Sequence, residues 1–289
     1  MIIKNMLIGA IIGIANIIPG VSGGTMMVIL NCYDKLIGAI SSLKKNWRSS
    51  LPYLASVGIG ALIAIGLLSK GIGYLLEHQY MIINFFFIGI IIGSFPMIYK
   101  KATVDRFQVS HLIPFVVTLG IMILTMVFSP DDSAETVIRQ LSLMSFIKLV
   151  ICSGIAAICM IIPGISGSFM MLLFGVYTTV VTAIGEFNAL VLIPVVIGVL
   201  LGILLGAKLI DFLMKRYPQA TYFAILGFVV GSVPVLFQKI VLTDNLRGGI
   251  TLVISIVALI LGAAVALVFD SPKFKKFFED KNQKKEEAV

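Results

Sequence analysis

An unusual hexapeptide occurs twice in this chain, each time inside an otherwise apolar stretch. The first copy is Pro19-Gly-Val-Ser-Gly-Gly24 and the second is Pro163-Gly-Ile-Ser-Gly-Ser168. At an offset of 144 residues, segments 14–33 and 158–177 agree at ten of twenty positions. Proline and paired glycines interrupt helices. The sequence therefore predicts two equivalent helix breaks.

Composition places these breaks in a membrane. Hydrophobic residues make up 59% of the chain and charged residues only 12%, with a mean hydropathy of +1.08; such values are typical of a polytopic membrane protein. A helix needs roughly 20 residues to span the hydrocarbon core. Six segments without Asp, Glu, Lys or Arg are about that long: 51–69, 81–99, 112–129, 187–207, 217–238 and 248–269. The motif regions, 5–33 and 149–185, also lack these residues.

The duplication extends beyond the hexapeptide. Residues 89–96 correspond to 227–234 at an offset of 138, so each half contains one motif region followed by three spans. We expect a single membrane transport domain over 1–289, with repeat one at 1–130, repeat two at 145–270 and a cytoplasmic tail at 271–289. Small residues four apart mostly serve helix packing, and this is the role we expect for Gly89, Gly93, Gly198, Gly202, Gly206, Gly227 and Gly231.

Two topologies fit this arrangement. If each motif region re-enters the membrane, the halves are inverted; if it crosses, the halves are parallel. With re-entrant hairpins and a cytoplasmic N-terminus, 17 of the 22 Lys and Arg lie inside and 5 outside, against 13 and 8 for the crossing arrangement with Lys35 left aside. The positive-inside rule favours the first topology. The net charge of +8 is thus an orientation signal, and we expect no nucleic-acid partner.

The predicted fold is an all-α polytopic membrane protein made of two inverted repeats, each a re-entrant helical hairpin plus three transmembrane helices. The protein would be multi-pass in the cytoplasmic (plasma) membrane, with both termini in the cytoplasm. Residues 6–18 would cover about 20 Å as helix, enough to reach the midplane only. The chain then breaks at 19–24, and a second half-helix is expected to run to about Ala39. Residues 149–162 and 168–184 repeat this hairpin, so the two tips are expected to meet near the bilayer centre.

Interrupted helices at corresponding places in two repeats are typical of a transporter's substrate site. Helix N-termini after each break offer N–H groups to an anion, and the nearby hydroxyls and one amide add donors. The simpler alternative is that the breaks only allow tight helix packing. The predicted substrate-binding residues are Asn16, Pro19, Gly20, Ser22, Gly23, Gly24, Thr25, Pro163, Gly164, Ser166, Gly167 and Ser168, with Arg139 and Lys148 as external cations that first capture the anion.

Nothing in the sequence indicates catalysis. The two histidines, His78 and His111, lie at span ends, and no acidic residue lies within a predicted span. There is no metal-ligand pattern and no acid–base pair. We therefore predict no catalytic residue, no metal and no cofactor. The cysteines, Cys32, Cys152 and Cys159, form no C-x-x-C pair and are expected to pack as small apolar side chains.

The paired motifs, residues 13–25 and 160–169, resemble those of the polyprenyl-phosphate transporter family of bacterial and archaeal membranes. The resemblance covers nearly the whole chain, roughly 4–270, including Tyr33 and Tyr177 after each motif. It implies a flippase that returns undecaprenyl phosphate, the lipid carrier of cell-envelope sugars, from the outer to the inner leaflet. The partners would be a polyprenyl phosphate lipid and the bilayer, with an oligomer left open.

Two alternatives to this function remain. A carrier or channel for a small soluble anion could use the same paired helix N-termini. A membrane enzyme acting on lipid phosphate is disfavoured, because the sequence lacks acid–base residues in its spans.

Overall fold

The computed structural model describes residues 2–17, 22–104, 109–127, 137–138, 141–244 and 248–271, and every regular element in these ranges is helical. Seven helices there are long and apolar enough to cross a membrane, or up to eight if one bent pair forms a single span. The long elements are α4 (Trp47–His78), α5 (Tyr80–Ala102), η1 (Val109–His111) with α6 (Leu112–Val127), α7 (Leu143–Ile161), α10 (Ala189–Arg216), α11 (Pro218–Asp244) and α12 (Ile250–Asp270). The six predicted spans are thus confirmed as helices, and α7 is a seventh.

The two motif regions are each divided into three helices rather than two. The first holds α1 (Ile2–Ile17), α2 (Gly23–Ile29) and α3 (Tyr33–Ser41); the second holds α7, α8 (Gly167–Leu173) and α9 (Tyr177–Gly185). The prediction of one continuous second half-helix was therefore wrong. Asn31 (φ 52°) and Gly175 (φ 62°), which correspond at the offset of 144, adopt the left-handed conformation that ends a helix. Asparagine tolerates this conformation better than most residues, so Asn31 can replace the glycine.

The first arm of the second hairpin is longer than predicted. A capping box at Ser142 and Ser145 starts α7 at Leu143, six residues before the expected start at 149. The 19 residues of α7 extend about 28 Å at 1.5 Å per residue. That length suffices to cross the hydrocarbon core. The α8–α9 pair behind it bends by 113°, as a broken span or a re-entrant loop does.

Close helix pairing through glycine is the main packing mode, as predicted from the small residues. Helix α1 packs along α4, where a Cβ on Gly9 or Gly13 would collide with the α4 backbone at Val57 or Ala61. The corresponding pair is α7 with α10, and Gly198 of α10 lies directly against the α7 backbone. Such contacts let two backbones approach where no hydrophobic effect drives association.

The third and fourth pairings cross between the two halves of the chain. Gly89 of α5 packs on α12 at Leu259, and Gly227 of α11 packs on α6 at Phe115. These two partners are 144 residues apart, the same offset as the hexapeptides. In both halves, therefore, the glycine-bearing helix packs on the last helix of the other half: α5 on α12, and α11 on α6. Helices α5 and α11 also pack against each other at the centre.

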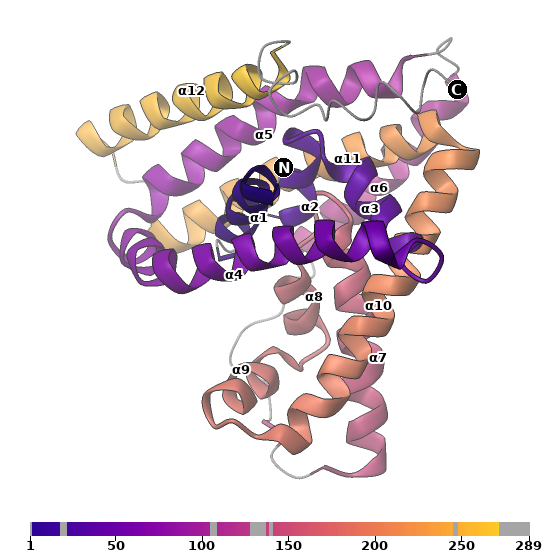
Figure 1. The fold of residues 1–289 in the computed structure, drawn as a ribbon. Helices are drawn as coiled ribbons and strands as arrows, with labels where there is room; N and C mark the ends of the chain where they lie inside the picture. Colours follow the sequence, from indigo (N-terminus) through magenta and orange to yellow (C-terminus); the bar gives the residue numbers. More distant parts are fainter. Residues whose placement is uncertain are drawn as a thin grey trace.

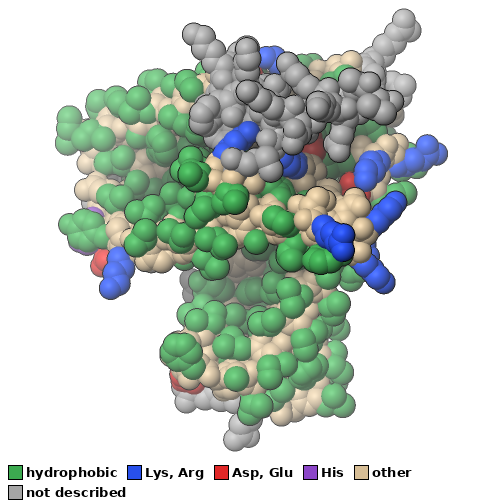
Figure 2. All heavy atoms as spheres, viewed as in Figure 1, with side chains coloured by type: hydrophobic (Ala, Val, Ile, Leu, Met, Phe, Trp, Pro, Cys, Tyr) green, Lys and Arg blue, Asp and Glu red, His purple; other side chains and the backbone are tan. Residues whose placement is uncertain are grey.

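The two hairpins differ in their burial. All residues of α2 except Met27 are buried, whereas Gly167 is the buried residue of α8. Figure 1 shows α7 and α10 running side by side away from the body formed by α4, α5 and α12, with α8 and α9 beside them. In Figure 2, hydrophobic side chains cover most of the visible face of that projecting part.

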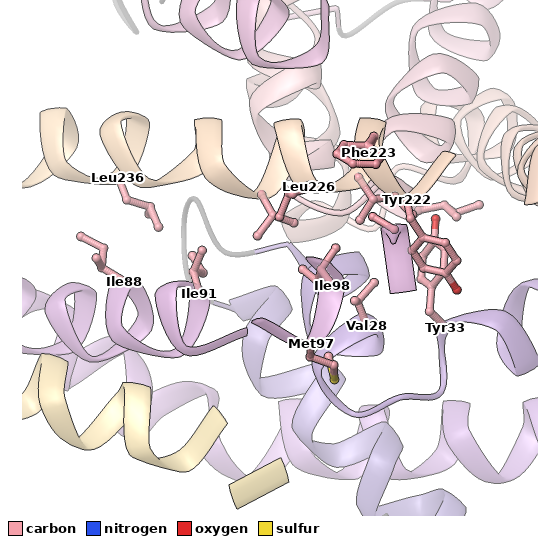
Figure 3. Close-up of a cluster of buried hydrophobic side chains, with 14 of the residues drawn as sticks. Val28, Tyr33, Ile88, Ile91, Met97, Ile98, Tyr222, Phe223, Leu226 and Leu236 are labelled. Carbon is pink, nitrogen blue, oxygen red and sulfur yellow. The ribbon is translucent and has the colours of Figure 1, made fainter. Parts of the chain in front are cut away.

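The largest hydrophobic cluster holds the first hairpin in the body. Val28 of α2 and Tyr33 of α3 pack with α5 and α11 residues such as Ile98 and Leu226 (Figure 3). Polar contacts at the edge of this cluster add to the restraint. The Tyr222 hydroxyl donates to Asp34 Oδ1 at 2.6 Å, and the Lys101 ammonium lies 3.0 Å from Asp34 Oδ2. Helix α3 is thereby tied to both α5 and α11.

Candidate functional site

The tips of the two hairpins touch each other, as the sequence predicted. The Gly164 N–H donates to Thr25 Oγ1 at 2.8 Å, and Ser22 Oγ donates to the Ile162 carbonyl at 3.3 Å. Both bonds join residues about 140 positions apart in the chain. Gly24 also faces the second tip, where an added Cβ would lie 2.6 Å from the Ile161 carbonyl oxygen. The repeated motif therefore forms one contact between the halves.

Gly164 is the position at which the junction most requires glycine. Its φ of +91° is one that side-chain-bearing residues rarely adopt, and an added Cβ would lie 2.5 Å from the Phe228 carbonyl oxygen in α11. The turn it makes presents the Gly164 N–H to Thr25. The conformation of this one residue thus links α7, α8 and the first hairpin.

The hydroxyls of the first motif are engaged within the protein. Ser22 is the N-cap of α2, accepting from the Gly24 N–H at 3.2 Å, and only 4% of its surface is exposed. Thr25 is 1% exposed and accepts the bond from Gly164. These side chains hold the junction together, which is close to the packing role that the sequence left open as the alternative.

The hydroxyls of the second motif are arranged differently. Ser166 makes no side-chain cap to α8, and its Oγ lies 2.8 Å from Ser168 Oγ. Ser168 is exposed and Ser166 half-buried. Two hydroxyls this close can both donate to a single acceptor. The two copies of the motif are therefore chemically distinct in the folded protein.

A cavity of about 350 Å³ opens at the junction and brings residues of both motifs together. Asn16, at the end of α1, reaches it from the first half, and its side chain lies against Gly23, where an added Cβ would be 2.7 Å from Asn16 Nδ2. None of the lining residues, all within the described part of the chain, carries a charge. They are Asn16, Ser22, Ala156, Ala157, Met160, Ile165, Ser166, Gly167, Ser168, Met171 and Val199.

Two further predicted site residues that the structure describes, Pro163 and Lys148, do not line this cavity. Pro163 is buried, and its backbone nitrogen lies close to Gly24 of the first motif. Lys148 is an exposed residue of α7 and belongs to neither cavity lining at the junction. Pro19, Gly20 and Arg139 lie outside the described residues.

One cation that the sequence analysis did not select lies beside the second motif. Lys239 of α11 lines a smaller cavity of about 20 Å³, which shares Ile165 and Ser166 with the larger one. Its ammonium is 5.5 Å from the centre of the Phe169 ring in α8. A signal for it exists in the sequence, because Lys239 corresponds to Lys101 at the same offset of 138 that relates the glycine motifs.

In the described residues, no group of three or more His, Cys, Asp or Glu side chains could hold a metal ion. The junction consequently offers hydroxyls, one amide and one nearby ammonium. Such donors suit an oxyanion better than a cation.

Comparisons with known proteins gave one matching family model and two curated relatives. Residues 12–251 match a family model described as undecaprenyl phosphate translocase-like. A curated relative from Staphylococcus aureus (strain NCTC 8325 / PS 47), named polyprenyl-phosphate transporter, is 34% identical over 271 residues, covering 91% of this chain and 94% of the relative. A second protein of that name, from Vibrio cholerae serotype O1, is 30% identical over 242 residues, covering 78% and 74%. No solved structure matches the chain.

Proposed function

The chain belongs to the undecaprenyl phosphate translocase-like family, and we propose that it carries polyprenyl phosphate, specifically undecaprenyl phosphate, from the outer to the inner leaflet of the cytoplasmic membrane. It is a multi-pass membrane transporter and not an enzyme. The observation that carries the proposal is the polar-lined cavity at the meeting point of two interrupted hairpins in an otherwise apolar helical protein.

The cavity suits the headgroup of such a lipid. A phosphate monoester carries about −1.5 to −2 charges at pH 7 and three acceptor oxygens. Ser166, Ser168 and the Asn16 amide are the donors that face it. A volume of about 350 Å³ lies at the low end of the roughly 300–1,000 Å³ typical of ligand sites. The phosphate and the first part of the chain fill it, and the long prenyl tail stays in lipid.

The surface next to the cavity supports this division of the substrate. Ile151 and Ile155 of α7 and Leu200 of α10 are at least 40% exposed. Apolar side chains there face acyl chains when the helices lie in a bilayer. The prenyl tail can therefore follow α7 and α10 within the lipid, and it is never exposed to water.

We propose further that the two halves are inverted repeats, residues 1–130 and 145–270, with a cytoplasmic tail at 271–289 and both termini in the cytoplasm. The exchanged contacts of Gly89 and Gly227 support a twofold relation between the halves. The 17-to-5 distribution of basic residues supports the orientation. An inverted pair of hairpins presents the same junction alternately to the two sides of the membrane.

The test is exchange of labelled undecaprenyl phosphate between leaflets of liposomes that contain the purified protein. We expect exchange of undecaprenyl phosphate but not of undecaprenol. In Ser166→Ala/Ser168→Ala, the substrate concentration that gives half-maximal exchange should rise at least tenfold, because hydrogen bonds to charged groups contribute about 1.5–3 kcal/mol each. Ser49→Ala, at an exposed serine far from the junction in sequence, is the matched control. Flux of inorganic phosphate without lipid exchange would instead identify a carrier for a soluble anion.

A further inference from the structure

Lys239 is a basic residue that lies both within a helix long and apolar enough to span the membrane and in a cavity lining beside the second motif. That candidate span of α11 covers Pro218–Leu242. A lysine in such a segment is costly and commonly marks a substrate pathway. A lysine close to a helix end can also extend its ammonium toward the membrane–water interface. The contacts of the Lys239 side chain therefore decide between the two roles.

The contacts of Lys239 point toward the hairpin junction. Its ammonium lies over the ring of Phe169, which belongs to α8, 5.5 Å from the ring centre. It shares a cavity lining with Gly164, Ile165 and Ser166 of the second motif. Ile165 and Ser166 also line the larger cavity, so the lysine and that cavity have these two residues as common neighbours.

Charge balance gives this position its significance. No residue lining the larger cavity is charged, and a phosphate monoester would bring more than one negative charge into it. A buried charge without a counterion is unfavourable. A flexible four-carbon side chain that bears a compact ammonium can move a few ångströms to meet the headgroup.

The corresponding lysine of the first half is committed elsewhere. Lys101 lies 3.0 Å from Asp34 Oδ2 and 3.5 Å from the Tyr222 hydroxyl. At the positions equivalent to Asp34 and Tyr222, the second and first halves have Thr178 and Asn84. The first half thus pairs Lys101 with a carboxylate of α3, whereas the residue equivalent to Asp34 in the second half is a threonine.

We propose that Lys239 is a substrate-binding residue, whose ammonium neutralises the phosphate of the lipid at the Ser166 side of the junction. This inference rests on the proposed function and names the cation that the cavity lining lacks. The positive-inside distribution places Lys239 toward the outer face, the side from which the lipid phosphate would enter. Capture of the anion by Arg139 and Lys148, as predicted from the sequence, stays a separate prediction.

The experiment compares purified wild type with Lys239→Gln, Lys239→Arg and the control Lys70→Gln, a variant of an exposed lysine on α4. Equilibrium binding of farnesyl phosphate, a short polyprenyl phosphate, is measured in detergent, with farnesol as the neutral probe. Undecaprenyl phosphate exchange is measured separately in liposomes. Monodispersity and helix content establish that each variant is folded.

We expect Lys239→Gln to weaken farnesyl phosphate binding by about tenfold or more, the usual effect of removing a charged partner, while farnesol binding stays unchanged. Lys239→Arg should retain most of the affinity, and Lys70→Gln all of it. Equal affinity of Lys239→Gln and wild type for farnesyl phosphate would overturn the assignment. If wild type binds farnesyl phosphate through Lys239 but exchanges no undecaprenyl phosphate, the site stands and the transport function fails.

Discussion

Replacing Thr25 with valine tests the junction between the two hairpins directly. Valine has nearly the shape of threonine but no acceptor for the Gly164 N–H, which is bonded to Thr25 Oγ1 at 2.8 Å. Thr25 is 1% exposed and Gly164 is buried, so water cannot take the place of the lost acceptor. An unsatisfied buried donor costs about 1–3 kcal/mol.

The unsatisfied Gly164 N–H destabilises the closed junction but not the separated tips, because this N–H can bond to another acceptor once the tips separate. The free energy needed to open the junction should therefore fall by the same 1–3 kcal/mol, which corresponds to roughly 5- to 150-fold more opening. Hydrogen–deuterium exchange of the segment containing Gly164 measures this population. We expect faster exchange there in Thr25→Val and unchanged exchange in α12.

Thr25→Ser is the matched control, because it keeps the hydroxyl and loses one methyl group. It should exchange at Gly164 close to the wild-type rate, even if the removed methyl costs about 1 kcal/mol of overall stability. Equal exchange at Gly164 in Thr25→Val and wild type would refute the hydrogen bond between the tips. Equally fast exchange in both variants would show that packing, and not the hydroxyl, closes the junction.

Two further predictions concern the turn at the second tip and the topology. Gly164→Ala should lower the free energy of unfolding by about 3 kcal/mol or more, from a positive φ and a collision with the Phe228 carbonyl; Gly175→Ala, also at positive φ but with open space around it, should cost only about 1–2 kcal/mol. Equal losses for the two variants would contradict the proposed close approach at Gly164. In a background without the three native cysteines, Lys44→Cys should resist an impermeant thiol reagent added outside intact cells and Glu186→Cys should react. Labelling of the cysteine at position 44 from outside would exclude the inverted arrangement.

Much of the fold follows from local patterns in the chain. Apolar runs long enough to span a bilayer predict helices regardless of their neighbours, and the six predicted spans all appear as helices. Glycines spaced for helix contact predicted packing, and Gly89, Gly198 and Gly227 do lie against neighbouring backbones. The second break in each hairpin was missed. A single residue at positive φ decides it, and Asn31 carries no strong signal of that conformation.

The sequence predicted that the two hairpin tips meet, but it did not predict which hydroxyls that contact uses. The repeated hexapeptide by itself determined that the chain breaks twice in equivalent positions, because Pro and Gly act on the local backbone wherever they stand. Only the tertiary structure decided what each copy does. Contact between the tips engages Ser22 and Thr25 in internal bonds and leaves Ser166 and Ser168 at the larger cavity, and Ser166 also shares the smaller cavity with Lys239. A hydroxyl is free for substrate or used by the protein according to what lies opposite it, and that depends on residues about 140 positions away.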